Sequence, residues 1–301
     1  MNLNHKKILV TGAKGMLGCD LLPLLQAKNA TILATARTAT SVKAVEVKVL
    51  DITDYSAVRD CFTEFAPDIV INCAACTRVD DAEKEYDFAF DVNSYAPEFL
   101  ADICKTFGSY LVHISTDYVF GGAKQLTRNT PYLESDEISP CGIYGHSKRF
   151  GELNIQSNLD SKYLILRTSW LHGIYGANFV DTMIKFGKEK GTVKVVSDQV
   201  GSPTWTGWLA EAIIKMIEKE AVGIFHLSSS GEGVSRYDFV KEIYKLAKVE
   251  AEIIPVTSEE FKRPAPRPLY SVLDVRKAES ILGEKCISWQ QGLEKHILAG
   301  I

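Results

Sequence analysis

One short stretch near the start of the chain restricts the fold more than any other. Residues 6–11 end in an apolar run typical of a buried strand, and a turn with glycines at Gly12, Gly15 and Gly18 follows at once. Leucines at helical spacing continue to Leu25. Strand, glycine turn and helix in this order predict a phosphate cradle, because glycines let the backbone approach a pyrophosphate and a helix N-terminus supplies N–H donors. A plain tight turn is the alternative, since the spacing is GxxGxxG rather than GxGxxG.

Strand-like and helical segments alternate along the next part of the chain. Apolar or alternating runs predict strands at 31–36, 45–49, 69–71, 110–114 and 163–166, with helices at 55–65, about 91–107 and from 144. This rhythm predicts an α/β fold with a doubly wound parallel (Rossmann) sheet. After about residue 170 the pattern loosens, with helices expected at about 177–190, 206–219 and 235–248. We therefore expect residues 1–170 to form a dinucleotide-binding domain with the catalytic residues. Residues 171–301 should form mainly a smaller substrate-binding region interleaved with the sheet.

Composition excludes several classes of protein. With 301 residues and 46% hydrophobic content, the chain can form one large domain, alone or with a smaller companion. A net charge of −4 with both signs interspersed argues against a nucleic-acid partner. No apolar stretch approaches the roughly 20 residues of a membrane span. Seven scattered cysteines suit a reducing compartment, so we expect a cytoplasmic protein. The CxxC pair Cys73 and Cys76 reads as two ordinary thiols rather than a zinc or redox site, because no second pair or His cluster accompanies it.

An acid–base pair is predicted at Tyr144 and Lys148. Four residues apart in a helix, the two side chains lie on one face, one turn apart. A nearby ammonium favours the phenolate and is expected to lower the pKa of Tyr144, so that the phenol can exchange a proton near neutral pH. His146 lies off this face and is expected to be exposed and uninvolved. The spacing alone is weak, since it occurs by chance in many helices.

The ends of the predicted strands carry further candidates for ligand binding. Arg37 stands where an acid would hold a ribose 2′-hydroxyl, so it faces either the 2′-phosphate of NADPH or solvent. Asp51 could accept from an adenine amino group. Ala74 and Ala75 are small enough for a flat ligand to lie close, and a polar segment that includes Thr77 follows them. The strand at 110–114 leads into Ser115-Thr116-Asp117-Tyr118, which places two hydroxyls, a carboxylate and a phenol at one strand end.

Together these motifs resemble a known enzyme family. The glycine turn, the Ser-Thr-Asp-Tyr-Val-Phe run at 115–120 and the Tyr144/Lys148 pair are similar to those of the extended short-chain dehydrogenase/reductases. Within them the chain most resembles the dTDP-4-dehydrorhamnose reductases. Asp51-Ile52-Thr53-Asp54, Asn72-Cys73-Ala74-Ala75, Val92-Asn93, Arg167-Thr168-Ser169-Trp170, Asp198-Gln199, Ser202-Pro203-Thr204, Arg267-Pro268 and Ser271-Val272-Leu273-Asp274 extend the match over roughly residues 7–275. The chain departs from the pattern at Cys73, Cys76, Trp205 and Tyr270, which bears on the sugar more than on the chemistry.

The resemblance implies a reaction and a role for each matching residue. It implies hydride transfer from NADPH or NADH, with NADPH favoured, to the C4 ketone of a nucleotide-linked 4-keto-6-deoxysugar. Tyr144 would donate the proton, Lys148 would keep it acidic and hydrogen-bond the nicotinamide ribose, and Thr116 would orient the ketone. Residues expected at the cofactor are Gly12, Gly15, Met16, Leu17, Arg37, Asp51, Ile52, Ala74, Ala75, Thr77, Tyr144 and Lys148. Residues expected at the substrate are Thr116, Asp117, Tyr118, Trp170, Gln199, Ser202 and Arg267.

Several alternatives stay open at this point. The protein could be a reductase or epimerase of another nucleotide sugar, or a regulatory subunit similar to the beta subunit of methionine adenosyltransferase. Tyr118 and Phe120 could serve packing alone, Trp170 could be core rather than a sugar-facing wall, and Asn93 could cap its helix rather than support Lys148 through water. Loop hydrogen bonding is the alternative for Gln199, Ser202 and Arg267. The residues show no metal-ligand cluster; only the resemblance raises Mg²⁺. We expect a monomer or a homodimer.

Overall fold

A central eight-stranded sheet organises the molecule. The computed structural model describes residues 1–42 and 45–300. In sheet order the strands are β12 (Gly223–His226), β7 (Tyr163–Thr168), β6 (Tyr110–Thr116), β5 (Ile69–Asn72), β1 (Lys7–Thr11), β2 (Thr31–Ala36), β4 (Val45–Val49) and β3 (Thr40–Val42). Neighbouring strands are parallel except for the edge pair β3 and β4, which is antiparallel. The strand order reverses direction at β1, as in a doubly wound sheet.

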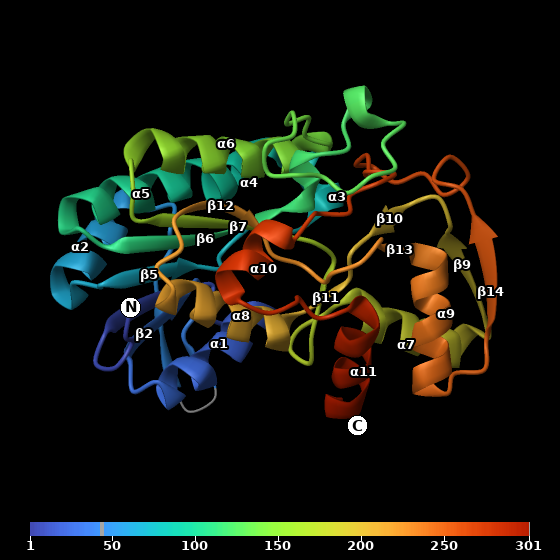
Figure 1. The fold of residues 1–301 in the computed structure, drawn as a ribbon, viewed down its shortest axis with the longest axis horizontal. Helices are drawn as coiled ribbons and strands as arrows, with labels where there is room; N and C mark the ends of the chain where they lie inside the picture. The colour runs from blue at the N-terminus through green and yellow to red at the C-terminus, as the bar shows by residue number, and fades with distance from the viewer. Residues whose placement is uncertain (43–44, 301) are drawn as a thin grey trace.

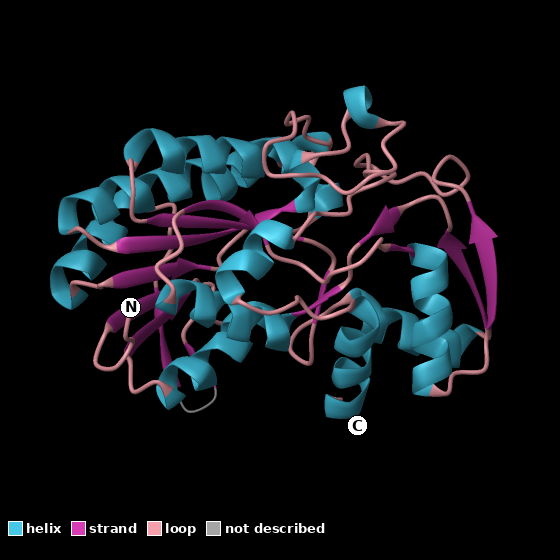
Figure 2. Cartoon of the chain, viewed as in Figure 1, coloured by secondary structure: helices cyan, strands magenta, loops and turns pink. Residues whose placement is uncertain are grey.

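Helices cover both faces of this sheet (Figures 1 and 2). One face carries α1 (Met16–Ala27), α8 (Thr206–Glu218) and α10 (Arg276–Leu282), and the other carries α2 (Tyr55–Phe65), α5 (Ala96–Phe107) and α6 (Gly142–Asn158). Each face has its own buried core. Leu21, Ile71 and Ile213 belong to the first core, and Phe62, Val70 and Ile155 belong to the second. The predicted α/β fold with a doubly wound parallel sheet is confirmed.

Local sequence signals account for many of the element boundaries. Helix α2 begins after Asp54, whose Oδ1 accepts the N–H of Ala57 at 3.0 Å and so caps the helix. The helix expected at about 91–107 differs from the prediction. Residues 86–107 instead run from α4 (Tyr86–Phe90) through a π-helical turn (Asp91–Tyr95) into α5, and α3 (Val79–Ala82) precedes them. Within the π-turn, the Asn93 amide bonds both backbone groups of Cys76 and the hydroxyl of Ser147, so it joins three segments rather than capping one helix.

The second half of the chain contributes to both parts of the molecule. A smaller lobe consists of α7 (Phe179–Lys190), α9 (Arg236–Ala247), α11 (Trp289–Ala299) and the parallel pair β9 (Thr192–Val196) and β14 (Glu252–Val256). Short strands β8 (Leu171–His172), β10 (Val200–Gly201), β11 (Thr204–Trp205) and β13 (Val234–Ser235) connect it to the sheet. Strand β12 and helices α8 and α10 return to the large sheet. A domain boundary near residue 170 remains a prediction.

Two one-turn 3₁₀ helices complete the description, η2 (Asp117–Val119) and η3 (Ala123–Gln125). Helix η2 begins directly after β6 and holds the Asp117-Tyr118 pair at the carboxyl end of that strand. Within residues 1–42 and 45–300, no helix is long and apolar enough to cross a bilayer.

Candidate active site

A cavity of about 950 Å³ opens at the carboxyl ends of the parallel strands. Gly12 follows β1, Arg37 follows β2, Ala74 follows β5, Asp117 follows β6 and Trp170 follows β7, and all five line the cavity. This is the position where ligands bind in open parallel sheets. Five cationic side chains face two carboxylates in this lining, although the chain as a whole carries a net charge of −4. The cavity therefore suits an anionic ligand.

The glycine turn forms the floor at one end of this cavity. Gly12 has φ +64°, and a Cβ there would lie 2.6 Å from the backbone nitrogen of Ala74. Only glycine fits such an approach without strain. Gly15 is the N-cap residue of α1 and has no side chain to accept hydrogen bonds from the first turn. The backbone N–H groups of that turn therefore face the cavity. These residues fit the diphosphate of a dinucleotide at a helix N-terminus.

The structure brings the predicted cofactor residues together around this floor. Gly12, Gly15, Met16, Leu17, Arg37, Asp51, Ile52, Ala74, Ala75 and Thr77 line the cavity with Tyr144 and Lys148. Arg37 is exposed, with its guanidinium 5.5 Å from the ring centre of Phe88. The Oδ1 atom of Asp51 accepts the backbone N–H of Thr53 at 3.0 Å and its hydroxyl at 2.8 Å, which leaves Oδ2 for a further donor. Their roles at a cofactor remain predictions.

Helix α6 places Tyr144 and Lys148 in the same cavity. The helix lies very close to η2, since a Cβ on Gly145 would lie 2.3 Å from the carbonyl oxygen of Tyr118. The Tyr144 ring packs edge-on against Tyr118, with the ring centres 5.4 Å apart. Lys148 is 2% exposed. Tyr144, Thr116 and Lys148 all line the same cavity.

The predicted lowering of the Tyr144 pKa is wrong for this structure. Burial raises the pKa of Tyr144, and the nearby Thr116 hydroxyl opposes this effect only in part. The Lys148 ammonium donates to the carbonyl oxygen of Ile114 at 2.6 Å rather than facing the phenol. Burial also lowers the pKa of Lys148 to about 8. Spacing in a helix identified the pair, but the desolvation of each group depends on the surrounding fold.

Asp117 organises the hydroxyl groups next to the pair. Its carboxylate accepts the hydroxyl of Thr116 at 3.1 Å and the hydroxyl of Ser169 at 2.9 Å. It is 2% exposed, and burial raises its pKa although these hydroxyls and that of Ser271 act in the opposite direction. Tyr118 is half-buried and lines the cavity, whereas Phe120 is fully buried and stacks on Tyr132 at 4.3 Å. Phe120 is therefore a packing residue.

Trp170 and Arg236 together form the far wall of the cavity, and the sequence analysis did not identify Arg236 as a site residue. Trp170 has φ +45°, and its ring leaves no room for a Cβ on Gly201, which would lie 2.4 Å away. The guanidinium of Arg236 lies 3.4 Å from the ring centre of Trp170. Burial lowers the pKa of Arg236 to about 10, although nearby Tyr118 and Asp117 oppose the shift. Arg236 is the first residue of α9, and no motif around it indicates a ligand contact.

Three predicted substrate residues lie outside the set that lines the cavity. Gln199 donates to the hydroxyl of Ser258 at 2.9 Å, and Arg267 forms an ion pair with Asp80 at 2.6 Å. Ser202 is 2% exposed, and its hydroxyl has no hydrogen-bond partner among the described residues. Contacts of Gln199, Ser202 and Arg267 with a substrate therefore remain predictions that the geometry of the cavity does not support.

A buried ion pair beneath the site was also missed. Glu152 and Arg167 are 0% and 1% exposed, and two N–H groups of Arg167 donate to the carboxylate at 2.8 Å each. Ser115 and Arg149 donate to the same carboxylate at 2.6 and 2.9 Å. The pair joins α6 to β6 and β7 one helical turn beyond Lys148. The four-residue spacing of Lys148 and Glu152, which puts both on one face of the helix, was the sequence signal that could have indicated this carboxylate.

The remaining sequence candidates are readily placed. His146 is exposed, as predicted. Cys73 and Cys76 are free thiols, and burial raises the pKa of both, that of Cys73 to about 12. Such thiols are poor nucleophiles and poor metal ligands at neutral pH. Among the described residues, no group of three or more His, Cys, Asp or Glu side chains is arranged to hold a metal ion, so Mg²⁺ has no assigned site.

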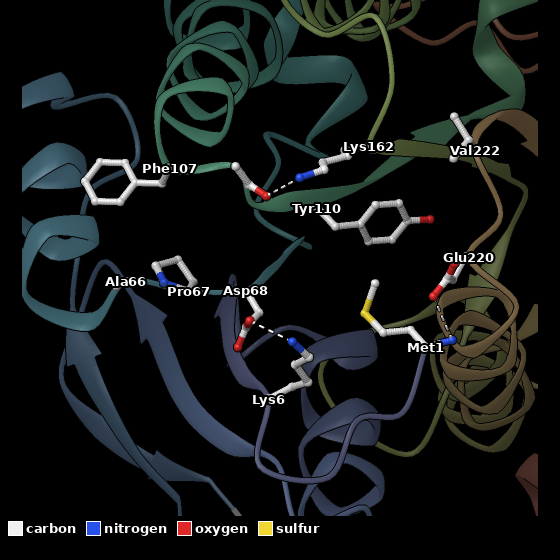
Figure 3. Close-up of a pocket in the computed structure, with 11 residues that line it drawn as sticks. Met1, Lys6, Ala66, Pro67, Asp68, Phe107, Tyr110, Lys162, Glu220 and Val222 are labelled. Carbon is white, nitrogen blue, oxygen red and sulfur yellow. Dashed lines mark hydrogen bonds and ion pairs between the residues drawn. The ribbon is translucent and has the colours of Figure 1, made fainter.

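A second hollow of about 520 Å³ lies at the opposite, amino-terminal edge of the sheet (Figure 3). Its charged side chains are already paired. Lys6 contacts Asp68 at 2.9 Å, Lys162 donates to the carbonyl oxygen of Gly108 at 3.0 Å, and Glu220 lies 3.3 Å from the amino group of Met1. None of the sequence-predicted site residues lies there. We place no function in it.

Comparison with known proteins decides the family. A sequence profile described as "RmlD substrate binding domain" matches residues 6–299. The chain belongs to the RmlD family. It is 41% identical over 292 residues to the spore coat polysaccharide biosynthesis protein SpsK of Bacillus subtilis, covering 97% of this chain and 96% of that protein. It is 39% identical over 291 residues to a dTDP-4-dehydrorhamnose reductase of Streptomyces griseus, covering 95% and 91%.

A solved structure of the RmlD family extends the match to three dimensions. The dTDP-4-dehydrorhamnose reductase of Bacillus anthracis, solved in complex with NADP, has a TM-score of 0.89 and 38% identity, covering 98% of this chain and 99% of that one. The family contains dTDP-4-dehydrorhamnose reductases and other dTDP-sugar ketoreductases. The protein is therefore an NAD(P)-dependent nucleotide-sugar reductase of this family, and the resemblance seen in the sequence is confirmed.

Proposed function

We propose that this protein uses NADPH or NADH to reduce the C4 ketone of dTDP-4-dehydro-L-rhamnose to dTDP-L-rhamnose. The observation that carries the proposal is that Thr116, Tyr144 and Lys148 line one cavity together with the glycine cradle. Full-length relatives named for this reaction support the choice of sugar. Arg37 at the mouth of the cavity, with an NADP-bound relative, favours NADPH.

Each residue of the site has a task in this reaction. The bound nicotinamide supplies the hydride. Tyr144 gives its phenolic proton to the oxygen that becomes an alkoxide. Thr116, whose hydroxyl donates to Asp117 in the structure, turns this donor to the same oxygen and fixes its direction. The raised pKa of Tyr144 keeps the proton on the phenol until that charge develops, when donors aimed at the oxygen stabilise the transition state most. In this proposal Lys148, which donates to the Ile114 carbonyl oxygen, holds the cofactor ribose.

Arg236 and Trp170 complete the substrate side in this proposal. A half-buried guanidinium stacked on an indole is a strong donor site for a diphosphate, because Arg forms bidentate bonds to phosphate oxygens. We assign Arg236 to the nucleotide diphosphate and Trp170 to the sugar face. Asp117 acts mainly by holding Thr116 and Ser169 rather than by a sugar contact, since those hydroxyls occupy its carboxylate.

The test is the oxidation of NADPH and NADH, followed by nicotinamide absorbance, with dTDP-4-dehydro-L-rhamnose as substrate. Tyr144→Phe should lower kcat by roughly 10²–10⁴-fold, the usual contribution of a general acid, with cofactor binding unchanged. Tyr118→Phe is the matched control, because its ring lies 5.4 Å from that of Tyr144 in the same cavity. Unimpaired turnover by Tyr144→Phe, or a greater loss in Tyr118→Phe, would refute the assignment.

A second candidate is the reduction of another dTDP-4-keto-6-deoxysugar. The relative SpsK, named for spore coat polysaccharide biosynthesis, is as similar to this chain as the named rhamnose enzymes. A panel of dTDP-4-keto-6-deoxysugars that differ at C3 and C5 separates the two candidates by kcat/KM. A wild-type protein that binds NADPH but reduces none of them would favour the regulatory-subunit alternative.

A further inference from the structure

A glycine lies directly behind the indole of Trp170. Gly201 is buried in β10, and a Cβ there would lie 2.4 Å from Cε2 and 2.7 Å from Cζ2 and Nε1 of Trp170. Non-bonded heavy atoms pack best at about 3.5–4.0 Å, so no side chain fits between the strand and the ring. The absence of a side chain at residue 201 is therefore what lets the indole lie against the backbone of β10.

The same strand also holds the residue that carries the stacked guanidinium. Strand β10 pairs with β13 in antiparallel register. Arg236 follows β13 directly, and its backbone N–H donates to the carbonyl oxygen of Gln199, the residue before β10, at 3.1 Å. Residues 199–201 therefore contact both members of the stack, the indole of Trp170 and the backbone of Arg236.

Further hydrogen bonds fix β10 to neighbouring loops. The N–H and carbonyl groups of Val200 both bond the backbone of the segment 269–271, at 2.8 and 2.9 Å. The Asp198 carboxylate accepts the backbone N–H and the hydroxyl of Ser258 at 2.8 and 2.7 Å, and the Gln199 amide donates to that hydroxyl at 2.9 Å. We therefore expect a Cβ added at residue 201 to displace the indole more easily than the strand.

The position of the Arg236 guanidinium depends on the aromatic rings around it. The guanidinium lies 3.4 Å from the ring centre of Trp170 and 4.7 Å from that of Phe179. Across the part of the chain that the structure describes, it forms no hydrogen bond or ion pair. Contact with an aromatic ring attracts a guanidinium and fixes its plane. A displaced indole would therefore leave Arg236 without the nearer of its two rings.

We propose that Gly201 is a positioning residue of the nucleotide-sugar site and acts through Trp170 on Arg236. Because residue 201 has no side chain, the indole lies against β10 and holds the guanidinium at the cavity, with its N–H donors available to a diphosphate. The inference rests on the proposed role of Arg236 at the diphosphate. Its test uses dTDP rather than a sugar substrate, so it can fail while the reductase assay succeeds, and it can succeed if the sugar proves to be another.

The test compares the dissociation constants of dTDP and NADPH for variants of the full chain, measured by isothermal titration calorimetry. dTDP carries the nucleoside and diphosphate of the proposed substrate without its sugar. Gly201→Ala should raise the Kd of dTDP by about tenfold, because a guanidinium that loses its stacked ring is no longer held for the phosphate oxygens. The Kd of NADPH should stay unchanged, because the glycine cradle follows β1 and does not contact β10.

Gly207→Ala is the matched control. Gly207 lies in α8, and a Cβ there would lie 2.4 Å from Cζ2 of Trp205. The variant therefore places the same clash against an indole outside the set that lines the cavity. Both variants should lose thermal stability, but Gly207→Ala should bind dTDP like the wild type. Equal weakening of dTDP binding in the two variants would overturn the proposal, because a displaced indole elsewhere in the fold would then have the same effect.

A double-mutant cycle shows whether Gly201 acts through the indole. Trp170→Leu removes the three ring atoms that the added Cβ would meet. In the Trp170→Leu background, Gly201→Ala should therefore weaken dTDP binding by no more than about twofold. A tenfold loss in that background would refute the route through Trp170, and an unchanged Kd of dTDP in the single variant Gly201→Ala would refute the positioning role itself.

Should Gly201→Ala fail to fold, Ser258→Ala decides instead. It removes the hydroxyl that bonds both Asp198 and Gln199, so that β10 is held less firmly, while the backbone N–H of residue 258 still donates to Asp198. The Kd of dTDP should rise by about threefold, since one or two hydrogen bonds are lost outside the cavity. A Ser258→Ala protein that binds dTDP as tightly as the wild type would then overturn the proposal.

Discussion

The buried ion pair of Glu152 and Arg167 gives the most quantitative prediction of stability. Both side chains are at most 1% exposed, and two hydrogen bonds of 2.8 Å join them. Arg167→Met would leave the carboxylate buried with only Ser115 and Arg149 as donors. Breaking such a pair from one side typically costs about 3–5 kcal/mol of the free energy of unfolding. At about 2 °C per kcal/mol for a chain of this size, Tm should fall by roughly 6–10 °C.

Arg149→Met provides the matched control for this experiment. Arg149 donates to the same carboxylate at 2.9 Å, but its side chain is 21% exposed, so water can replace much of the bond. Its loss should cost about 1 kcal/mol. Thermal unfolding of both variants without ligands gives the comparison. Equal losses of Tm in Arg149→Met and Arg167→Met would show that burial of the pair does not govern its energy.

The pH dependence of the same pair has a definite sign. Burial alone would raise the pKa of Glu152, but the hydrogen bonds and charge of Arg167 outweigh it and hold the pKa below 4.5. A lowered pKa in the folded state stabilises the fold above the unfolded pKa, and this stability is lost as the pH falls through the folded pKa. The Tm difference between wild type and Arg167→Met should therefore shrink below about pH 4. A difference that grows on acidification would contradict this reasoning.

Three further predictions follow from the cavity. Gly12→Ala, with a Cβ 2.6 Å from a backbone nitrogen at φ +64°, should weaken NADPH binding by about tenfold or more in a fluorescence titration. The pKa of Lys148 in the folded protein is lowered to about 8, so the wild type gains stability as the pH rises from about 8 to 10. Lys148→Met removes this group, so its Tm should exceed that of the wild type most below pH 8 and progressively less toward pH 10. Arg236→Gln should raise KM for the nucleotide sugar by roughly tenfold or more with little change in kcat, measured by steady-state kinetics; an unchanged KM would remove Arg236 from the diphosphate site.

Much of the fold could be predicted from the sequence, because it depends on short-range signals. The glycine turn at residues 12–18 acts within one turn of chain, and the structure has it where expected. Six strands of the central sheet were also recognisable, since buried parallel strands are almost continuously apolar. The two edge strands, β3 and β12, were missed, because three and four residues give too short a pattern. The π-turn at residues 91–95 depends on bonds from Asn93 to segments far along the chain.

The sequence predicted site residues only where they belong to a recognisable motif. Tyr144 and Lys148 were found by spacing, but their pKa values depend on burial, which no local pattern gives. Arg236 reaches the cavity from a helix that begins some 90 residues after Tyr144, with no motif of its own. The hydrogen-bonded side chains of Thr11, Asn72 and His113 come from three strands that are consecutive in the sheet but separated by 61 and 41 positions in the chain. Only the strand order makes them neighbours.

The return of β12 to the large sheet has a consequence for how the protein is made. This strand pairs with β7 in parallel register, and α8 covers the same apolar face as α1. A ribosome that has passed residue 170 has therefore produced a sheet that lacks its last strand and two helices, α8 and α10, that cover one face together with α1. Nascent chains of this length expose a strand edge and apolar side chains, which favour chaperone binding and aggregation. We therefore expect a chain truncated near residue 170, which lacks β12 and α8, to leave a strand edge and apolar side chains of the sheet exposed.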